Sequence, residues 1–181
     1  MTIMQFTEDA IPADLKPIDQ VSASDLVWKR RQLFDRDFEL RSDNDELVAR
    51  LRHGRIIRWQ AEAATAIGQF KVARRSPKKP WHIEIGVGMQ SGTVYAEFNG
   101  DFKAGEFKMS DGRVFQLEPN RGGWRLVDAE RRPVLLMKRP SGPLYQRSTF
   151  SLGAAGLSLQ DATLLALFAG YFQTMRPTRR G

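Results

Sequence analysis

The sequence has no cysteine and only two histidines in 181 residues. The absence of cysteine excludes a disulfide framework and thiolate chemistry, and it fits a reducing compartment. His53 and His82 have no further histidine or carboxylate cluster at the spacing of a metal site or a general base, and we expect both on exposed turns or strands. We therefore expect no metal, no cofactor and no enzymatic activity.

We also expect neither a secretory leader nor an apolar run long enough for a membrane span. The N-terminus has neither the basic start nor the apolar stretch of a signal peptide, so we expect a cytoplasmic protein. The uncharged stretch at 162–175 has 14 residues, whereas a spanning helix needs about 20. We expect no transmembrane span, and a peripheral position at the membrane fits this composition.

Positive charge dominates the chain and is unevenly spread. The formal net charge is +7, but residues 1–25 carry five acids and one base, which leaves +11 for residues 26–181. We interpret residues 1–25 as an extended acidic segment and residues 26–181 as a single domain. A basic body attracts polyanions such as nucleic acid, anionic lipid headgroups or acidic proteins.

Residues 26–150 show the alternation of short β-strands separated by turns. Residues 93–98 alternate and end at Asn99-Gly100, a strong hairpin signal because both turn positions tolerate a positive φ. Similar runs and turns continue to residue 138, and further alternating segments lie upstream. The pattern predicts about twelve strands in an antiparallel meander.

Residues 158–175 predict one helix that is apolar on every side. Ser158 and Asp161 resemble a capping box, and Arg176 follows the last apolar residue. Such a helix must be surrounded by other structure or lie in a bilayer. We favour the first, because about twelve strands can close into a barrel wide enough to hold a helix; a membrane tail is the alternative. The predicted fold is thus mainly β, a closed antiparallel barrel around a central hydrophobic C-terminal helix.

The strand series through 105–109, 111–115 and 123–128, followed by the apolar segment 164–172, resembles the tubby-like β-barrel superfamily, which includes the phospholipid scramblases and the LURP-one-related proteins. The similarity covers residues 26–175 and is one of pattern and order. It implies phosphoinositide binding by a basic surface for tubby-like members, and phospholipid movement with a calcium response for scramblase-like members. Scrambling is not expected here, because the chain lacks a cysteine-rich segment and 43–46 lacks the spacing and glycine of a calcium loop.

The candidate site is the basic loop within 71–81, in which five cations surround a proline-containing turn. The residues predicted to bind an anionic ligand are Lys71, Arg74, Arg75, Lys78, Lys79 and Trp81. Long cationic side chains at a loop tip can meet several phosphates, and tryptophan suits a lipid interface or a stacked base. A merely solvated turn is the alternative interpretation.

From these features we expect a non-catalytic binding module that engages an anionic phospholipid or membrane surface. A protein-interaction or regulatory scaffold, in which the acidic N-terminal segment makes the contact, is the first alternative. Nucleic-acid binding also stays open, because a basic body does not distinguish phosphate on lipid from phosphate on RNA.

Overall fold

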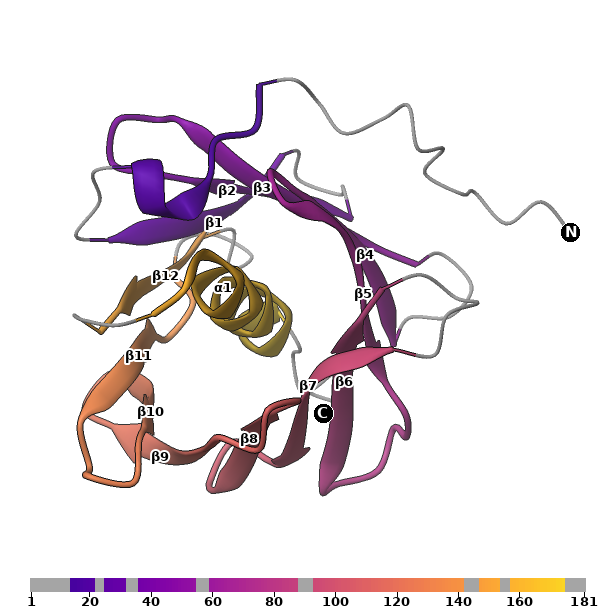
Figure 1. The fold of residues 1–181 in the computed structure, drawn as a ribbon, viewed down its shortest axis with the longest axis vertical. Coiled ribbons are helices and arrows are strands. Elements are labelled where there is room, and N and C mark those ends of the chain that lie inside the picture. Colours follow the sequence, from indigo (N-terminus) through magenta and orange to yellow (C-terminus); the bar gives the residue numbers. More distant parts are fainter. Residues whose placement is uncertain are drawn as a thin grey trace, which may run out of the picture.

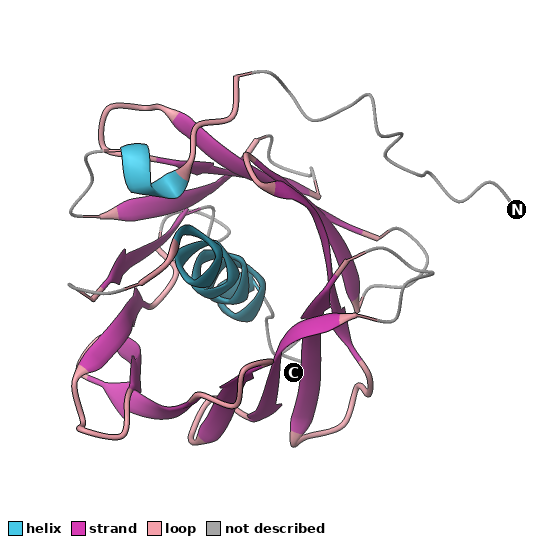
Figure 2. Cartoon of the chain, viewed as in Figure 1, coloured by secondary structure: helices cyan, strands magenta, loops and turns pink. Residues whose placement is uncertain are grey.

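The computed structural model describes residues 14–21, 25–31, 36–54, 59–87, 93–141, 147–153 and 157–174. Twelve strands form a closed antiparallel barrel, in which strands that are neighbours in the sequence are also neighbours in space (Figures 1 and 2). The strands are β1 (Leu26–Arg30), β2 (Asp37–Arg41), β3 (Leu47–His53), β4 (Gln60–Thr65), β5 (Gly68–Arg74), β6 (Trp81–Gly86), β7 (Val94–Gly100), β8 (Gly105–Met109), β9 (Val114–Asn120), β10 (Gly123–Val127), β11 (Pro133–Lys138) and β12 (Arg147–Leu152).

The barrel closes where β1 pairs with both β2 and β12. Val27 of β1 lies opposite Arg41 on one side and opposite Thr149 on the other. Since every strand has two hydrogen-bonded neighbours, the sheet exposes no edge. The predicted fold class, a closed antiparallel meander of about twelve strands, is confirmed.

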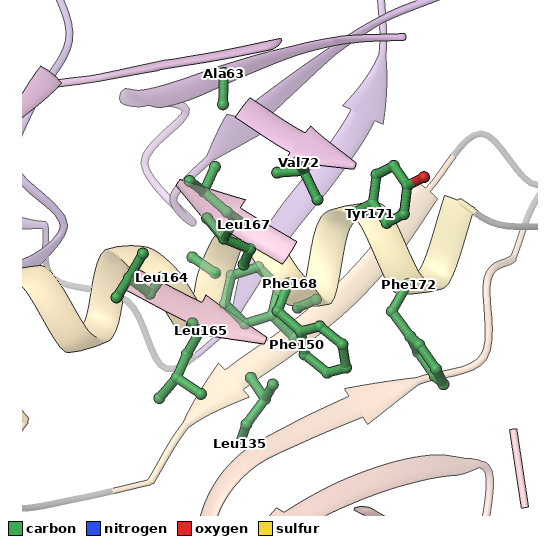
Figure 3. Close-up of a cluster of buried hydrophobic side chains, with 14 of the residues drawn as sticks. Ala63, Val72, Leu135, Phe150, Leu164, Leu165, Leu167, Phe168, Tyr171 and Phe172 are labelled. Atoms are coloured by element: carbon green, nitrogen blue, oxygen red, sulfur yellow. The ribbon is translucent and has the colours of Figure 1, made fainter. Parts of the chain in front are cut away.

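The predicted helix is confirmed as α1 (Leu159–Thr174), which lies inside the barrel (Figure 2). Every residue from Asp161 to Gln173 is buried, so the helix has no solvent face. Its start is set by Ser158, whose hydroxyl accepts a hydrogen bond from the backbone N–H of Asp161 over 3.1 Å. Leu167 and Tyr171 pack on the side of Val72, while Leu165 points the opposite way, toward Leu135 (Figure 3).

The helix lies off the barrel axis, close to β1 and β12, and small residues permit this approach (Figure 1). The indole N–H of Trp28 in β1 donates to the carbonyl of Ala166 over 3.0 Å. A Cβ atom on Gly170 would lie 2.5 Å from the same indole. On the other side, aromatic rings span the wider gap: Phe168 lies 5.0 Å from Phe98 and 4.9 Å from Phe107, measured between ring centroids.

The hairpin predicted at Asn99-Gly100 is displaced by two residues. Both residues belong to β7, and the turn is formed by 101–104, where the backbone N–H of Asp101 donates to the carbonyl of Ala104. The Asp101 carboxylate accepts hydrogen bonds from the N–H groups of Lys103 and Ala104, which stabilises this longer turn. The turn also places Phe102 against Trp81 and Trp124.

Residues 14–21, which we call the strap, pack on the barrel beside the start of α1. They include the short 3-10 helix η2 (Ile18–Gln20). The side chains of Leu15 and Ile18 are buried, and the backbone N–H of Lys16 donates to the carbonyl of Leu47 in β3. This part of the predicted extended acidic segment is therefore attached to the domain, while residues 1–13 lie outside the described part of the chain.

Candidate functional site

The two ends of the barrel differ sharply in charge. In an antiparallel meander alternate turns lie at the same end, and we name the ends after the helix: α1 begins at the Leu159 end and finishes at the Thr174 end. The described turn residues at the Thr174 end include eight basic side chains, all exposed, against one acidic side chain, Asp101. We call these eight the basic rim: Arg31, Arg36, Arg75, Lys78, Lys79, Lys103, Arg121 and Arg139.

The Leu159 end has the opposite balance. Its described turns and the strap carry eight acidic and four basic side chains. The acids are Asp14, Asp19, Asp43, Asp45, Glu46, Asp111, Asp128 and Glu130, and the bases are Lys16, Arg113, Arg131 and Arg132. Ion pairs neutralise several of these acids within the same end, as between Asp128 and Arg132. The molecule thus presents one strongly basic end and one mixed, acidic end.

Lys71 lies apart from the basic rim, although we predicted it as a site residue. It sits in the middle of β5 on the outer wall, opposite Glu62 of β4. Burial raises the pKa of the Glu62 carboxyl, while the charges of Arg52 and Lys71 act to lower it. Lys71 therefore belongs to the charge pattern of the wall.

Arg75 belongs to the rim, but its guanidinium is also held by the wall. Its Nε donates to a carboxylate oxygen of Glu84 over 2.6 Å, and this hydrogen bond raises the pKa of Arg75. Glu84 lies directly opposite Glu97, and His82 approaches both, with Nε2 3.2 Å from Glu97 and 3.6 Å from Glu84. The two carboxylates near His82 come from its own strand, as Glu84, and from the adjacent strand, as Glu97.

Lys78 and Lys79 form the exposed tip of the predicted loop, whereas Trp81 is buried. The Trp81 side chain is 4% exposed and belongs to the core, so its ring does not face solvent at the loop tip. The Trp81 ring makes an edge-on contact with Phe102 on the core side of the loop. The ammonium of Lys79 lies 5.0 Å from the Trp81 ring centroid and 5.6 Å from that of Phe102. Aromatic rings therefore position Lys79 through cation–π contact.

Trp59 is an exposed aromatic residue at this end, and we did not predict it as a site residue. It is 37% exposed, and its ring lies 5.9 Å from the half-buried guanidinium of Arg74, which also lies 5.7 Å from the Trp81 ring. The carbonyl of Trp59 accepts the Tyr171 hydroxyl over 2.6 Å, so the internal helix fixes this residue. Burial raises the pKa of Tyr171 to about 12, which keeps the hydroxyl a donor.

His53 lies beneath the rim, against the end of the helix, rather than on an exposed turn as we expected. Its ring stacks on Tyr171, and Nε2 lies 3.1 Å from the hydroxyl oxygen of Thr174. Burial, reinforced by the positive charges of Arg30 and Arg36, lowers the pKa of His53 to about 4. The imidazole is therefore neutral at physiological pH and adds no charge to the basic end.

Five rim residues were outside the predicted site: Arg31, Arg36, Lys103, Arg121 and Arg139. They lie in four different turns, so no local run of charge connects them. The antiparallel meander was the available signal, because alternate turns of a meander lie at the same end, and this places all five residues at the Thr174 end. Arg139 is positioned like Lys79, with its guanidinium 5.9 Å from the Trp124 ring centroid.

Internal space and metal-binding groups are limited in the described part of the chain. A pocket beside the start of α1, lined in part by the strap, has room for about one water molecule. The described ranges contain no group of three or more histidine, aspartate or glutamate side chains placed to hold a metal ion. Nor does a helix in these ranges have the length and apolarity needed to cross a membrane.

Comparisons with protein-family models, curated proteins and solved structures found no match. The fold places the chain in one architectural class, a closed twelve-stranded antiparallel β-barrel with an internal helix.

Proposed function

We propose that the protein is a non-catalytic binding module that docks on an anionic phospholipid surface through the basic rim. The observation that carries this proposal is the separation of charge: among the described turn residues, the Thr174 end has eight exposed cations and one acid, and the other end has an acidic excess. Each basic residue near an anionic membrane contributes about 1 kcal/mol of attraction. A rim of this size therefore supplies enough attraction for peripheral binding.

The shape of the rim favours a plane over a nucleic-acid strand as the ligand. Twelve strands about 4.8 Å apart and tilted by about 40° enclose a barrel roughly 24 Å wide, and the rim cations are distributed over several turns at its end. Such an end can meet many headgroups at once. Several cations of the outer wall, by contrast, are paired with acids, as Arg52 is with Asp37 and Arg125 is with Glu118.

We further propose that the chain is related to the tubby-like superfamily and that it acts at the cytoplasmic face of a membrane. The order of twelve strands followed by an enclosed helix supports the first part of this proposal. The anionic lipids of the cytoplasmic leaflet, together with the cysteine-free composition, support the second.

Sedimentation with vesicles of pure phosphatidylcholine, and with vesicles containing phosphatidylserine, tests the proposal. Binding should require phosphatidylserine and should weaken as salt shortens the range of the attraction. Replacing Lys78, Lys103 and Arg121 with Gln removes three rim charges. It should reduce affinity by roughly a hundredfold, given about 1 kcal/mol per charge.

A matched control removes the same amount of charge elsewhere. Lys108 on the outer face of β8, and Arg131 and Arg132 at the Leu159 end, are all exposed. The variant with Gln at these three positions should bind anionic vesicles within a few-fold of the wild type. Equal losses of vesicle affinity in both variants would mean that net charge alone drives binding. If the wild type bound a single-stranded RNA more tightly than vesicles, nucleic acid would replace lipid as the proposed ligand.

A further inference from the structure

The strap covers an apolar groove at the Leu159 end without being part of the barrel wall. The groove is formed by Leu159 and Thr163 of α1 and by the β4–β5 turn, which contributes Ala66 and Ile67. Ile18 of the strap closes it as a member of the main core, with only 7% of its surface exposed. Ile67 continues the groove into solvent, since it is 39% exposed.

The strap binds the barrel as a short peptide would. It presents two aliphatic side chains three residues apart, Leu15 and Ile18, which enter two neighbouring hydrophobic clusters. Between them, the backbone N–H of Lys16 donates to the carbonyl of Leu47 over 2.9 Å. The Lys16 ammonium also pairs with Glu46, and this contact lowers the pKa of the Glu46 carboxyl.

The barrel does not depend on the strap for closure. Every strand already has two hydrogen-bonded neighbours, because β1 pairs with β12 as well as with β2. Release of the strap therefore breaks no strand pairing. It exposes two buried aliphatic side chains, at a cost of about 3 to 6 kcal/mol, and this cost is offset by the conformational freedom that eight residues regain. The strap is thus placed to exchange with a competitor.

We propose that this groove is a docking site for a peptide segment of a partner protein that carries two aliphatic side chains three residues apart, and that the strap occupies the site as an internal competitor. This inference goes beyond membrane binding, because it concerns the opposite end of the barrel. A barrel docked through its basic rim would keep this groove accessible to the partner.

The test uses the full chain and a fluorescent peptide with the sequence of residues 14–21. A tethered segment competes at an effective concentration of about 1 mM. In the variant Leu15→Ser with Ile18→Ser the strap should no longer compete for the groove. This variant should therefore bind the peptide at least tenfold more tightly than the wild type does. The control variant Asp14→Ser with Gln20→Ser, changed at two exposed strap positions, should match the wild type. A peptide with serine in place of both aliphatic residues should not bind.

Equal peptide binding by the wild type and the Leu15→Ser, Ile18→Ser variant would overturn the proposal. The proposal would also fail if this variant kept a native near-ultraviolet circular dichroism spectrum but did not bind the peptide. Hydrogen exchange of the wild type provides a second reading that needs no substitution. The amides of the strap should exchange at least a hundredfold faster than those of β3, because the strap opens without the barrel. Equal protection of the two segments would contradict an exchangeable strap.

Discussion

At the scale of single residues, Gly170 determines how closely the helix approaches the wall. An added Cβ atom would lie 2.5 Å from the Trp28 indole, a distance that forces one of the two elements to move. The indole itself is held by its hydrogen bond to Ala166. Which strand residue Gly170 meets depends on the register of β1, and no local pattern of the sequence reveals that register.

Gly170→Ala should destabilise the protein by about 2 kcal/mol, because overpacking outweighs the gain of about 1 kcal/mol in helix propensity. Denaturant unfolding measures this change. In a Trp28→Phe background the smaller ring leaves room for the methyl group, so the same substitution should cost at least about 1 kcal/mol less. An equal cost in both backgrounds would show that Trp28 is not the limiting contact.

His53 should make the stability of the protein depend on pH. Because its pKa is about 4 in the folded state and about 6.5 in the unfolded chain, the unfolded state binds more protons between these values. The stabilisation is complete above pH 6.5 and is lost as the pH falls to 4, by about 3 kcal/mol. His53→Gln should remove this contribution, so the difference in unfolding free energy between wild type and variant should shrink on acidification. Parallel stability curves would contradict a buried neutral imidazole.

At the scale of elements, the helix was the most predictable part of the molecule. The expected range 158–175 differs from the observed Leu159–Thr174 by one residue at each end, because a capping serine and the end of the apolar run are both local signals. The turn at 101–104 was less predictable, because Asp101 competes with Asn99-Gly100 for the reversal of the chain through two hydrogen bonds. When two neighbouring segments have turn signals of similar strength, tertiary packing selects between them. Here the selected turn is the one that packs Phe102 against Trp81 and Trp124.

A salt bridge between two elements secures the start of the helix. Arg113, in the turn immediately before β9, donates to Asp161 in the first turn of α1 over 2.8 Å and also pairs with Asp111. These two carboxylates raise the pKa of the Arg113 guanidinium. The contact therefore connects the internal helix to the surrounding wall at the Leu159 end.

The coupling between Arg113 and Asp161 should be about 1 to 2 kcal/mol, the usual range for a charge-assisted hydrogen bond that is partly buried. A double-mutant cycle with Arg113→Gln and Asp161→Asn measures it by denaturant unfolding. Asp111→Asn in place of Asp161→Asn is the control, since Asp111 is exposed and should couple more weakly. Additive effects of Arg113→Gln and Asp161→Asn would show that the pair contributes nothing.

At the scale of the whole molecule, the chain gathers distant charges at one end. The predicted site at 71–81 contained three rim residues, Arg75, Lys78 and Lys79, because these lie together in the sequence. The other five come from four other turns and meet only through the antiparallel topology. Trp81 was predicted to bind an anionic ligand, but its ring is buried, because whether a ring faces the core depends on where its strand begins. Topology, rather than local composition, therefore defines the candidate binding surface.

The orientation of the barrel on a membrane tests this surface most directly. The chain has no cysteine, so a single introduced cysteine can be labelled uniquely. Ala104→Cys places a fluorophore at the Thr174 end, and Ala129→Cys places one at the Leu159 end; both positions are exposed. On anionic vesicles that contain a headgroup-level quencher, binding through the basic rim predicts strong quenching of the label at 104 and little at 129. Equal quenching at both positions, or stronger quenching at 129, would contradict it.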